Sequence, residues 1–308
     1  MNTSALATAS LSSSRPDVSV VPSRRRGRRR RSGASALALA LVATIGVLPA
    51  SPASATTNRA TLGDVSATLT YQGTYPTPRA ATITITRAGH VVYHAAVRAA
   101  FCGTLCWPSP AYGYGDANPL RVVRLEPGSP DVVLGLYSGG AHCCYIDQVF
   151  APASPTSTTY TKSEILLGDP GALLKTLPGS PYVALVTADD TFAYAFTDYA
   201  ASALPLKIMR FSNRHFRDVT KDYPALIRAD ASMWLKAFYS LAPTHYADSV
   251  GAIAAWAADE YQLGRVAPAN AFLRQQAAAG HLNNALTPSE KGFVFVAALV
   301  KFLRHGGY

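Results

Sequence analysis

The sequence lacks the short motifs that identify many common enzyme classes. It contains no His-Glu-x-x-His, no Gly-x-Ser-x-Gly, no phosphate-binding loop and no Gly-x-Gly-x-x-Gly at the start of a helix. These absences argue against motif-bearing hydrolases and nucleotide-dependent enzymes. Enzymes without short motifs stay open, so the sequence decides neither for nor against catalysis, and it implies no cofactor.

Long hydrophobic runs are also scarce beyond residue 55. The strongest run, Phe293 to Leu303, is interrupted by Lys301 and is shorter than the roughly 20 residues that span a bilayer as a helix. We interpret this run as a buried helix. No membrane span is therefore expected once the N-terminal segment described next is removed.

The first 55 residues predict a secretory signal peptide. Seven arginines between positions 24 and 31 are followed by the uncharged stretch Ala34 to Leu48 and then by Ala53-Ser54-Ala55. This is the order of a basic region, a short apolar region and small residues at a cleavage site. We place cleavage after Ala55, with Ala53 as the rival and an uncleaved anchor as the alternative. The mature protein is expected to be secreted, extracellular or cell-wall associated.

The signal peptide carries most of the positive charge. Eight of the 28 basic residues, but one of the 18 acidic residues, lie in residues 1–55, which leaves 20 basic and 17 acidic residues. A net charge of +3 on the mature chain does not support a nucleic-acid surface. We therefore expect no nucleic-acid partner.

Residues 56–221 have the pattern of β-strands. Thr82 to Thr86 alternates with Ile on one face, and short β-branched or apolar runs such as Lys207 to Phe211 are bounded by turn residues. Residues 151–162 are rich in Pro, Ser and Thr and predict an exposed loop.

Residues 222–308 have helical spacing instead. Helix starts are expected near Pro224, Asp248 and Pro268, and Thr287 to Glu290 has the form of a capping box. The sequence thus predicts an α+β fold, with an antiparallel β domain over 56–221 and four C-terminal helices over 222–308.

A repeat of 51 residues is present within the β region. Pro127-Gly128-Ser129-Pro130 recurs as Pro178-Gly179-Ser180-Pro181. Each copy precedes an apolar strand, then a small or acidic turn, and then an expected aromatic strand. The turns are Ser138-Gly139-Gly140 and Asp189-Asp190-Thr191. A period near 50 is typical of tandem β units, although two copies cannot close a propeller ring.

The segment Ser138-Gly139-Gly140-Ala141-His142-Cys143-Cys144 resembles an uncharacterised family of secreted bacterial proteins. More distantly, these units are similar to the FG-GAP or VCBS-type repeats of integrin-like β-propellers. Those repeats carry Asp-rich calcium loops. At the corresponding positions, Glu126 to Ser129 and Leu177 to Ser180, most of the ligand oxygens are missing. The resemblance covers roughly residues 120–220 and implies no known activity.

Four cysteines, Cys102, Cys106, Cys143 and Cys144, favour two disulfides in an exported chain. Links from Cys102 and Cys106 to the adjacent pair are preferred, because each would close a loop of about 40 residues. The alternative is local, with Cys102 bonded to Cys106 and a vicinal Cys143–Cys144 bond, whose small ring distorts its peptide bond. The residues alone leave the pairing open.

The cysteines and His142 could also form a metal site or a catalytic site. Cys102, Cys106, His142 and Cys143 are residue types that bind zinc, although their spacing is not a standard zinc pattern. A cysteine nucleophile with His142 as its base would need adjacent residues to reach each other, and no third orienting group is evident.

The one dense acidic cluster contains Asp189, Asp190 and Asp198. Paired carboxylates could serve glycoside hydrolysis, and a turn is the plainer interpretation because Asp favours turns.

Tyrosine is abundant, with 16 residues. Core packing is the preferred interpretation of these tyrosines, and the alternative is an exposed tyrosine face, which would suit contact with a protein or a glycan. The tyrosines of the β region that could form such a face are Tyr112, Tyr114, Tyr137, Tyr145, Tyr194 and Tyr199.

Two functions follow as hypotheses. The first is a secreted, disulfide-stabilised, non-catalytic binding or structural module whose ligand the sequence does not identify. The second is an extracellular hydrolase without a recognisable short motif, with Asp189, Asp190 and His142 as the residues to test.

Overall fold

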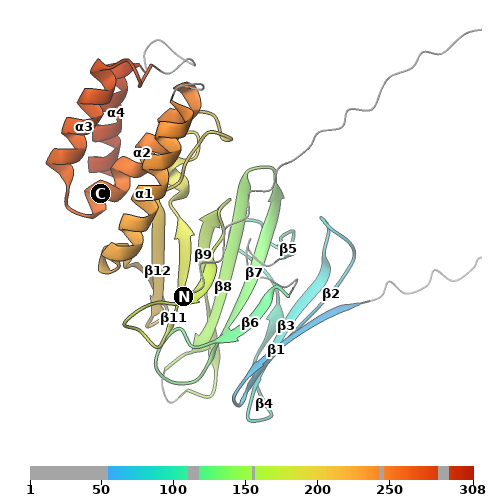
Figure 1. Cartoon of the computed structure of the whole chain (residues 1–308). Helices are drawn as coiled ribbons and strands as arrows, with labels where there is room; N and C mark the ends of the chain where they lie inside the picture. Colours follow the sequence, from blue (N-terminus) through green and yellow to red (C-terminus); the bar gives the residue numbers. More distant parts are fainter. Residues whose placement is uncertain (1–54, 110–117, 155–156, 243–245, 284–290) are drawn as a thin grey trace, which may run out of the picture. The chain divides into compact units, whose positions relative to one another are not determined.

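The computed structural model describes residues 55–109, 118–154, 157–242, 246–283 and 291–308. All the elements below belong to one compact unit, Ser51–Tyr308. Antiparallel strands come first along the chain and the α-helices follow them, so the predicted α+β class is confirmed (Figure 1). The change from strands to helices falls at a short 3-10 turn, η2 (Thr220–Asp222), next to the predicted boundary at 221.

The first sheet is a meander of four antiparallel strands in sequence order. Its inward face is supplied by strictly alternating residues, as in β2, where Val65, Ala67 and Leu69 are buried and the residues between them are not. The strands are β1 (Thr56–Leu62), β2 (Val65–Gln72), β3 (Arg79–Arg87) and β4 (His90–Ala96).

The second sheet has two long strands, β7 (Asp131–Gly140) and β8 (Cys143–Pro152), at its centre. Strand β9 (Tyr160–Gly168) pairs with β8, while β5 (Trp107–Pro108) and β6 (Leu120–Val123) both pair with β7. The loop predicted over 151–162 is therefore shorter than expected, because β8 runs to Pro152 and β9 begins at Tyr160.

The third sheet is again a simple antiparallel meander. It consists of β10 (Leu173–Thr176), β11 (Val183–Ala188), β12 (Leu206–Ser212) and β13 (His215–Asp218). The aromatic strand that the repeat predicted after Asp189 is absent from the described residues 189–205. A 3-10 turn, η1 (Asp190–Phe192), takes its place, because the Asp189 side chain accepts from the Thr191 N–H and starts that turn.

The central sheet is buried on both faces. Successive residues of β8 alternate between two hydrophobic clusters. Ile146 and Phe150 pack with the first sheet, whereas Tyr145 and Val149 pack with Leu185 and other residues of the third sheet. Two-sided burial gives β8 a continuous buried stretch from residue 144 to 151, with no polar alternation to mark it as a strand.

The four helices are α1 (Pro224–Leu241), α2 (Tyr246–Gln262), α3 (Val266–Ala278) and α4 (Gly292–His305). Pro224 begins α1 as predicted, whereas α2 and α3 each begin two residues before the expected Asp248 and Pro268. The capping box at Thr287 to Glu290 lies outside the described residues. No helix in the described part of the chain is long and apolar enough to span a membrane.

Helix α2 is enclosed by the rest of the unit, and it passes very close to the segment that precedes β12. A methyl group on Gly251 would lie 2.0 Å from the Ala201 carbonyl oxygen, so only glycine allows this approach.

A pair of carboxyl groups, one half-buried on α1 and one fully buried on α2, lies near the start of β12. The Asp230 carboxylate accepts from the Leu206 N–H at 2.9 Å and from the Trp234 indole N–H at 3.0 Å. Asp259, fully buried on α2, lies close enough to Asp230 for the two carboxyl groups to interact electrostatically. Burial, reinforced by the negative charge of Asp230, raises the pKa of Asp259 to about 10. The folded protein therefore keeps a proton on this pair at neutral pH.

This proton makes stability depend on pH. Unfolding at neutral pH releases it, because an exposed Asp has a pKa near 3.9. The stability associated with Asp259 is thus fully present below about pH 4 and is lost as pH rises toward 10. Asp259→Asn, which keeps the shape without the titration, should gain about 1.4 kcal/mol of unfolding free energy over the wild type for each pH unit. Urea denaturation at half-unit steps from pH 5 to 8 measures this slope.

The exposed carboxyl Asp222 provides the control, because Asp222→Asn makes the same substitution at the surface. Asp131, whose pKa burial raises to about 7, is present in every variant and cancels from the difference. Parallel stability curves for the wild type and Asp259→Asn would show that Asp259 is ionised in the folded state.

Candidate functional site

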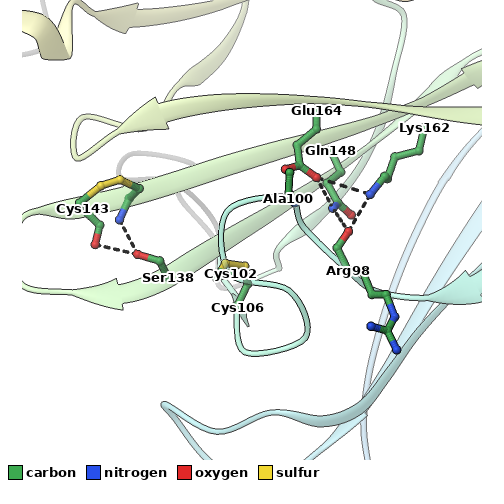
Figure 2. Close-up of a disulfide and its surroundings, with 10 residues drawn as sticks. Arg98, Ala100, Cys102, Cys106, Ser138, Cys143, Gln148, Lys162 and Glu164 are labelled. Atoms are coloured by element: carbon green, nitrogen blue, oxygen red, sulfur yellow. Dashed lines mark hydrogen bonds and ion pairs between the residues drawn. A yellow bond between two sulfur atoms is a disulfide. The ribbon is translucent and has the colours of Figure 1, made fainter.

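The turn between β7 and β8 carries the Ser138–Cys144 segment and is fixed at both ends. The Ser138 hydroxyl donates to the Cys143 carbonyl at 2.8 Å and accepts from the Cys144 N–H at 2.7 Å (Figure 2). The Tyr137 hydroxyl donates to the Gly140 carbonyl. His142, at the tip, is exposed. The turn therefore presents His142 from a rigid base.

The four cysteines are paired locally in the structure. Cys102 and Cys106 have their Cα atoms 5.5 Å apart, those of Cys143 and Cys144 are 3.0 Å apart, and both pairs are compatible with disulfides. The preferred cross-links between the two pairs are therefore wrong. The reason is a tight turn, in which the Leu105 N–H donates to the Cys102 carbonyl at 3.0 Å and brings Cys106 back to Cys102.

The 98–106 loop is docked on the central sheet by side chains rather than by a cross-link. Glu164 accepts from the Ala100 N–H at 2.8 Å, and Gln148 donates to the Arg98 carbonyl at 2.7 Å (Figure 2). Lys162 donates to the same carbonyl at 2.6 Å. These hydrogen bonds, and not the expected sulfur bonds, anchor the loop to β8 and β9.

The alternative metal set, Cys102, Cys106, His142 and Cys143, is not brought together. Each cysteine is paired with another cysteine, and the His142 ring contacts an aromatic ring described below. Within the described ranges, no three His, Cys, Asp or Glu side chains are grouped so that they could hold a metal ion.

Asp189 and Asp190 are adjacent in sequence but engage different partners. The Asp189 carboxylate accepts from the Tyr308 hydroxyl at 2.6 Å and from the Thr191 hydroxyl at 2.9 Å, and it pairs with the Lys207 ammonium at 3.4 Å. Burial favours a higher pKa for Asp189, but the Tyr308 bond, the Lys207 charge and the Thr191 bonds outweigh it and lower the pKa. Asp189 is thus an ionised carboxylate that closes the C-terminus onto the third sheet.

Asp190 belongs to a second group of residues. Its carboxylate accepts from the Asp169 N–H at 3.3 Å, and burial, together with the charges of Asp169 and Asp189, raises its pKa. The Asp190 carboxyl can occupy this position because residue 168 is a glycine. A methyl group on Gly168 would lie 2.1 Å from the Asp190 carboxyl carbon.

Three aromatic rings complete this group. The His142 ring centroid lies 3.9 Å from that of Tyr199, and the Tyr194 centroid lies 5.3 Å from that of Tyr199. The Tyr199 hydroxyl donates to the Asp169 carboxylate, and burial and this bond raise the pKa of Tyr199. We call His142, Asp169, Asp190, Tyr194 and Tyr199 the aromatic–carboxylate cluster.

The cluster contains two of the three predicted catalytic candidates, His142 and Asp190. The third, Asp189, is not a member because it binds other partners. Asp198, the third member of the predicted acidic cluster, accepts from the Ala201 N–H at 3.0 Å within its own turn. Asp169 has no signal in the sequence that would have identified it. It follows β9 without any motif, and only the pairing of β8 with β9 brings it near the His142 turn.

The tyrosines of the β region divide between core and surface, so the preferred core packing holds for some of them and not for Tyr194. Tyr194 is 59% exposed and Tyr199 is half-buried in the cluster. Tyr145 is buried and stacks on Tyr137 with ring centroids 4.8 Å apart. Tyr112 and Tyr114 lie outside the described residues. The surface part of the cluster therefore offers aromatic faces beside carboxylate oxygens.

Comparison with known proteins gives one partial similarity. The uncharacterized protein y4bJ of Sinorhizobium fredii is 24% identical over 139 residues, which are 44% of this chain and 20% of that protein. This chain thus matches about a fifth of the length of that relative. No family model matches the chain, and no solved structure matches it.

The local cysteine pairing predicts a simple peptide map. Trypsin cuts after Arg98, Arg121, Arg124 and Lys162, so each cysteine pair lies within its own peptide. Under non-reducing conditions, mass spectrometry should find residues 99–121 and 125–162 as separate peptides. Each should be lighter than its reduced form by the mass of two hydrogen atoms. A joined species containing both peptides would restore the cross-linked arrangement.

Replacement of Gly168 tests the placement of Asp190. Gly168→Ala should destabilise the protein by about 2–4 kcal/mol, because the methyl group adds a collision with Asp190 to the cost of a positive φ. Gly63→Ala is the control, since Gly63 has a φ of +60° against +67° for Gly168 and no atom within 4 Å of the position that its methyl group would take. Thermal and urea unfolding measure both losses. Equal losses would show that the Asp190 carboxyl lies elsewhere.

Proposed function

We propose that the protein is an exported, non-catalytic carbohydrate-binding module, and that the aromatic–carboxylate cluster is its binding site. The observation that carries this proposal is the exposed Tyr194 ring beside the His142–Tyr199 stack, with Asp169 and Asp190 next to it. The cluster supports the alternative interpretation in which exposed tyrosines contact a glycan.

The chemistry of the cluster suits a saccharide. A pyranose ring has an apolar face of C–H groups, which stacks on aromatic rings, and hydroxyl groups at its edge, which donate to carboxylates. Tyr194 and His142 supply exposed rings, and Asp169 and Asp190 supply acceptor oxygens. Aromatic side chains also lose little conformational entropy on binding, because they have few rotatable bonds. A rigid aromatic platform with nearby acceptors favours a sugar over a flat apolar ligand.

Export of the chain is supported by the agreement between two boundaries. The signal peptide is expected to end at Ala55, and the first strand of the fold, β1, begins at Thr56. Cysteine pairs positioned for disulfides suit an oxidising location. A secreted or cell-wall-associated protein would also meet polysaccharides. Likewise, we propose that the resemblance to secreted proteins with the Ser138–Cys144 motif reflects a shared turn that presents a histidine.

The hydrolase alternative has less support. It requires Asp189, Asp190 and His142 to act together, but Asp189 is engaged by Tyr308, Thr191 and Lys207. A carboxylate that holds three partners in the folded protein has a structural role. His142 contacts Tyr199, Tyr199 donates to Asp169, and the Asp169 N–H donates to Asp190, so these contacts link His142 to Asp190 through two other residues.

Binding can be measured with purified peptidoglycan, chitin and cellulose in sedimentation assays, and with a printed glycan array. Tyr194→Ala should weaken binding about 3- to 10-fold, the loss expected for one aromatic stacking contact. Tyr239→Ala is the matched control, because Tyr239 is 53% exposed on α1 and lies outside the cluster. The control should bind like the wild type.

Two results would contradict the proposal. One is the absence of binding to every glycan by a folded wild-type protein. The other is release of new reducing ends from a glycan, abolished by Asp190→Asn without loss of folding, which would establish the hydrolase instead.

A further inference from the structure

Helix α4 has apolar residues on two faces. One face, which includes Phe295, Leu299 and Leu303, is buried in the helical core. The other begins with two neighbouring side chains, Phe293 and Val294, which are 59% and 57% exposed. A contiguous exposed apolar patch points to an interaction site more than singly exposed side chains do.

A groove of about 710 Å³ follows this second face. Phe293, Ala297 and Val300 line it, and their spacing of four and then three residues places them on one side of the helix. The positions span about 10 Å along the helix axis. The apolar lining is therefore continuous rather than a set of isolated side chains.

The charged residues of the groove are all basic. Arg274 of α3 and Lys301 and Arg304 of α4 line it, and α3 and α4 contain no Asp or Glu. None of the ion pairs within the described residues involves these three side chains. From Val266 to the C-terminus, the sequence has one acidic residue, Glu290. The groove thus combines an apolar strip with uncompensated positive charge.

We propose that this groove is a docking surface for an anionic phospholipid bilayer. Exposed apolar side chains enter the boundary between headgroups and acyl chains, while neighbouring Lys and Arg side chains contact the phosphates. Phe293, which lines the groove, and its exposed neighbour Val294 suit the first role. Arg274, Lys301 and Arg304, which also line the groove, suit the second. The two neighbouring exposed side chains favour a bilayer over an acidic peptide, which would need deep pockets for its own apolar residues. The contact is peripheral and reversible.

Vesicle sedimentation tests this surface with proteins that begin at Thr56, because the strongly basic signal peptide would itself bind anionic lipid. All described strands and helices are retained in such a chain. The wild type should bind phosphatidylcholine vesicles containing phosphatidylglycerol, more weakly at high salt, and should not bind pure phosphatidylcholine. Lys301→Gln with Arg304→Gln should reduce binding about 25-fold, at about 5-fold for each charge. Phe293→Ser should reduce it about 10-fold.

The control is Lys175→Gln with Arg217→Gln, which removes the same charge from exposed positions of the third sheet. It should retain wild-type binding, and circular dichroism should show that every variant is folded. An equal loss in the control pair, unchanged binding in the test variants, or binding to an acidic amphipathic peptide without binding to vesicles would each overturn the proposal.

Discussion

The burial of the central sheet on both faces is the constraint on which the rest of the structure depends. One face of β7 and β8 packs on the first sheet, and the other packs on the third. These two strands therefore carry almost no polar surface along their middle, and they emerge into solvent only at their ends. The β7–β8 turn, where His142 lies, is one of these ends. The buried interior thus brings the His142 turn to the surface.

The same constraint explains how the candidate site is assembled. The pairing of β8 with β9 places Asp169 near the turn, and η1 orients Asp190 toward Asp169 while Asp189 faces Tyr308. In a continuing strand, Asp189 and Asp190 would have pointed to opposite faces of one sheet. In the 3-10 turn they instead reach different groups of partners. The divergence of Asp189 and Asp190 therefore separates a structural carboxylate from one that belongs to the aromatic–carboxylate cluster.

Most strands that have one polar face can be predicted from the sequence, because alternation such as that of Thr82 to Thr86 shows directly in the residues. Strands β8 and β9 cannot be recognised from alternation. Strand β8 is buried on both faces and therefore has no alternating polar residues, and β9 borders the Pro-rich segment. The helix starts predicted at Pro224, Asp248 and Pro268 lie within two residues of the observed starts. The prediction of an aromatic strand after Asp189 is wrong, because the Asp189 side chain caps a 3-10 turn there. His142 and Asp190 could be named from the sequence, but their association through Tyr199 and Asp169 depends on long-range pairing.

The local pairing of the cysteines has a consequence for how the fold is maintained. A disulfide that closes a ring of about five residues stabilises the fold by about 2 kcal/mol, because it lowers the conformational entropy of the unfolded chain. A ring of about 40 residues would contribute about 4 kcal/mol. Adjacent cysteines restrict it even less. The three sheets and the helical core must therefore hold together mainly through apolar packing. Each cysteine also has its partner within its own short segment, four residues away or adjacent, so the pairing of one segment does not depend on the other.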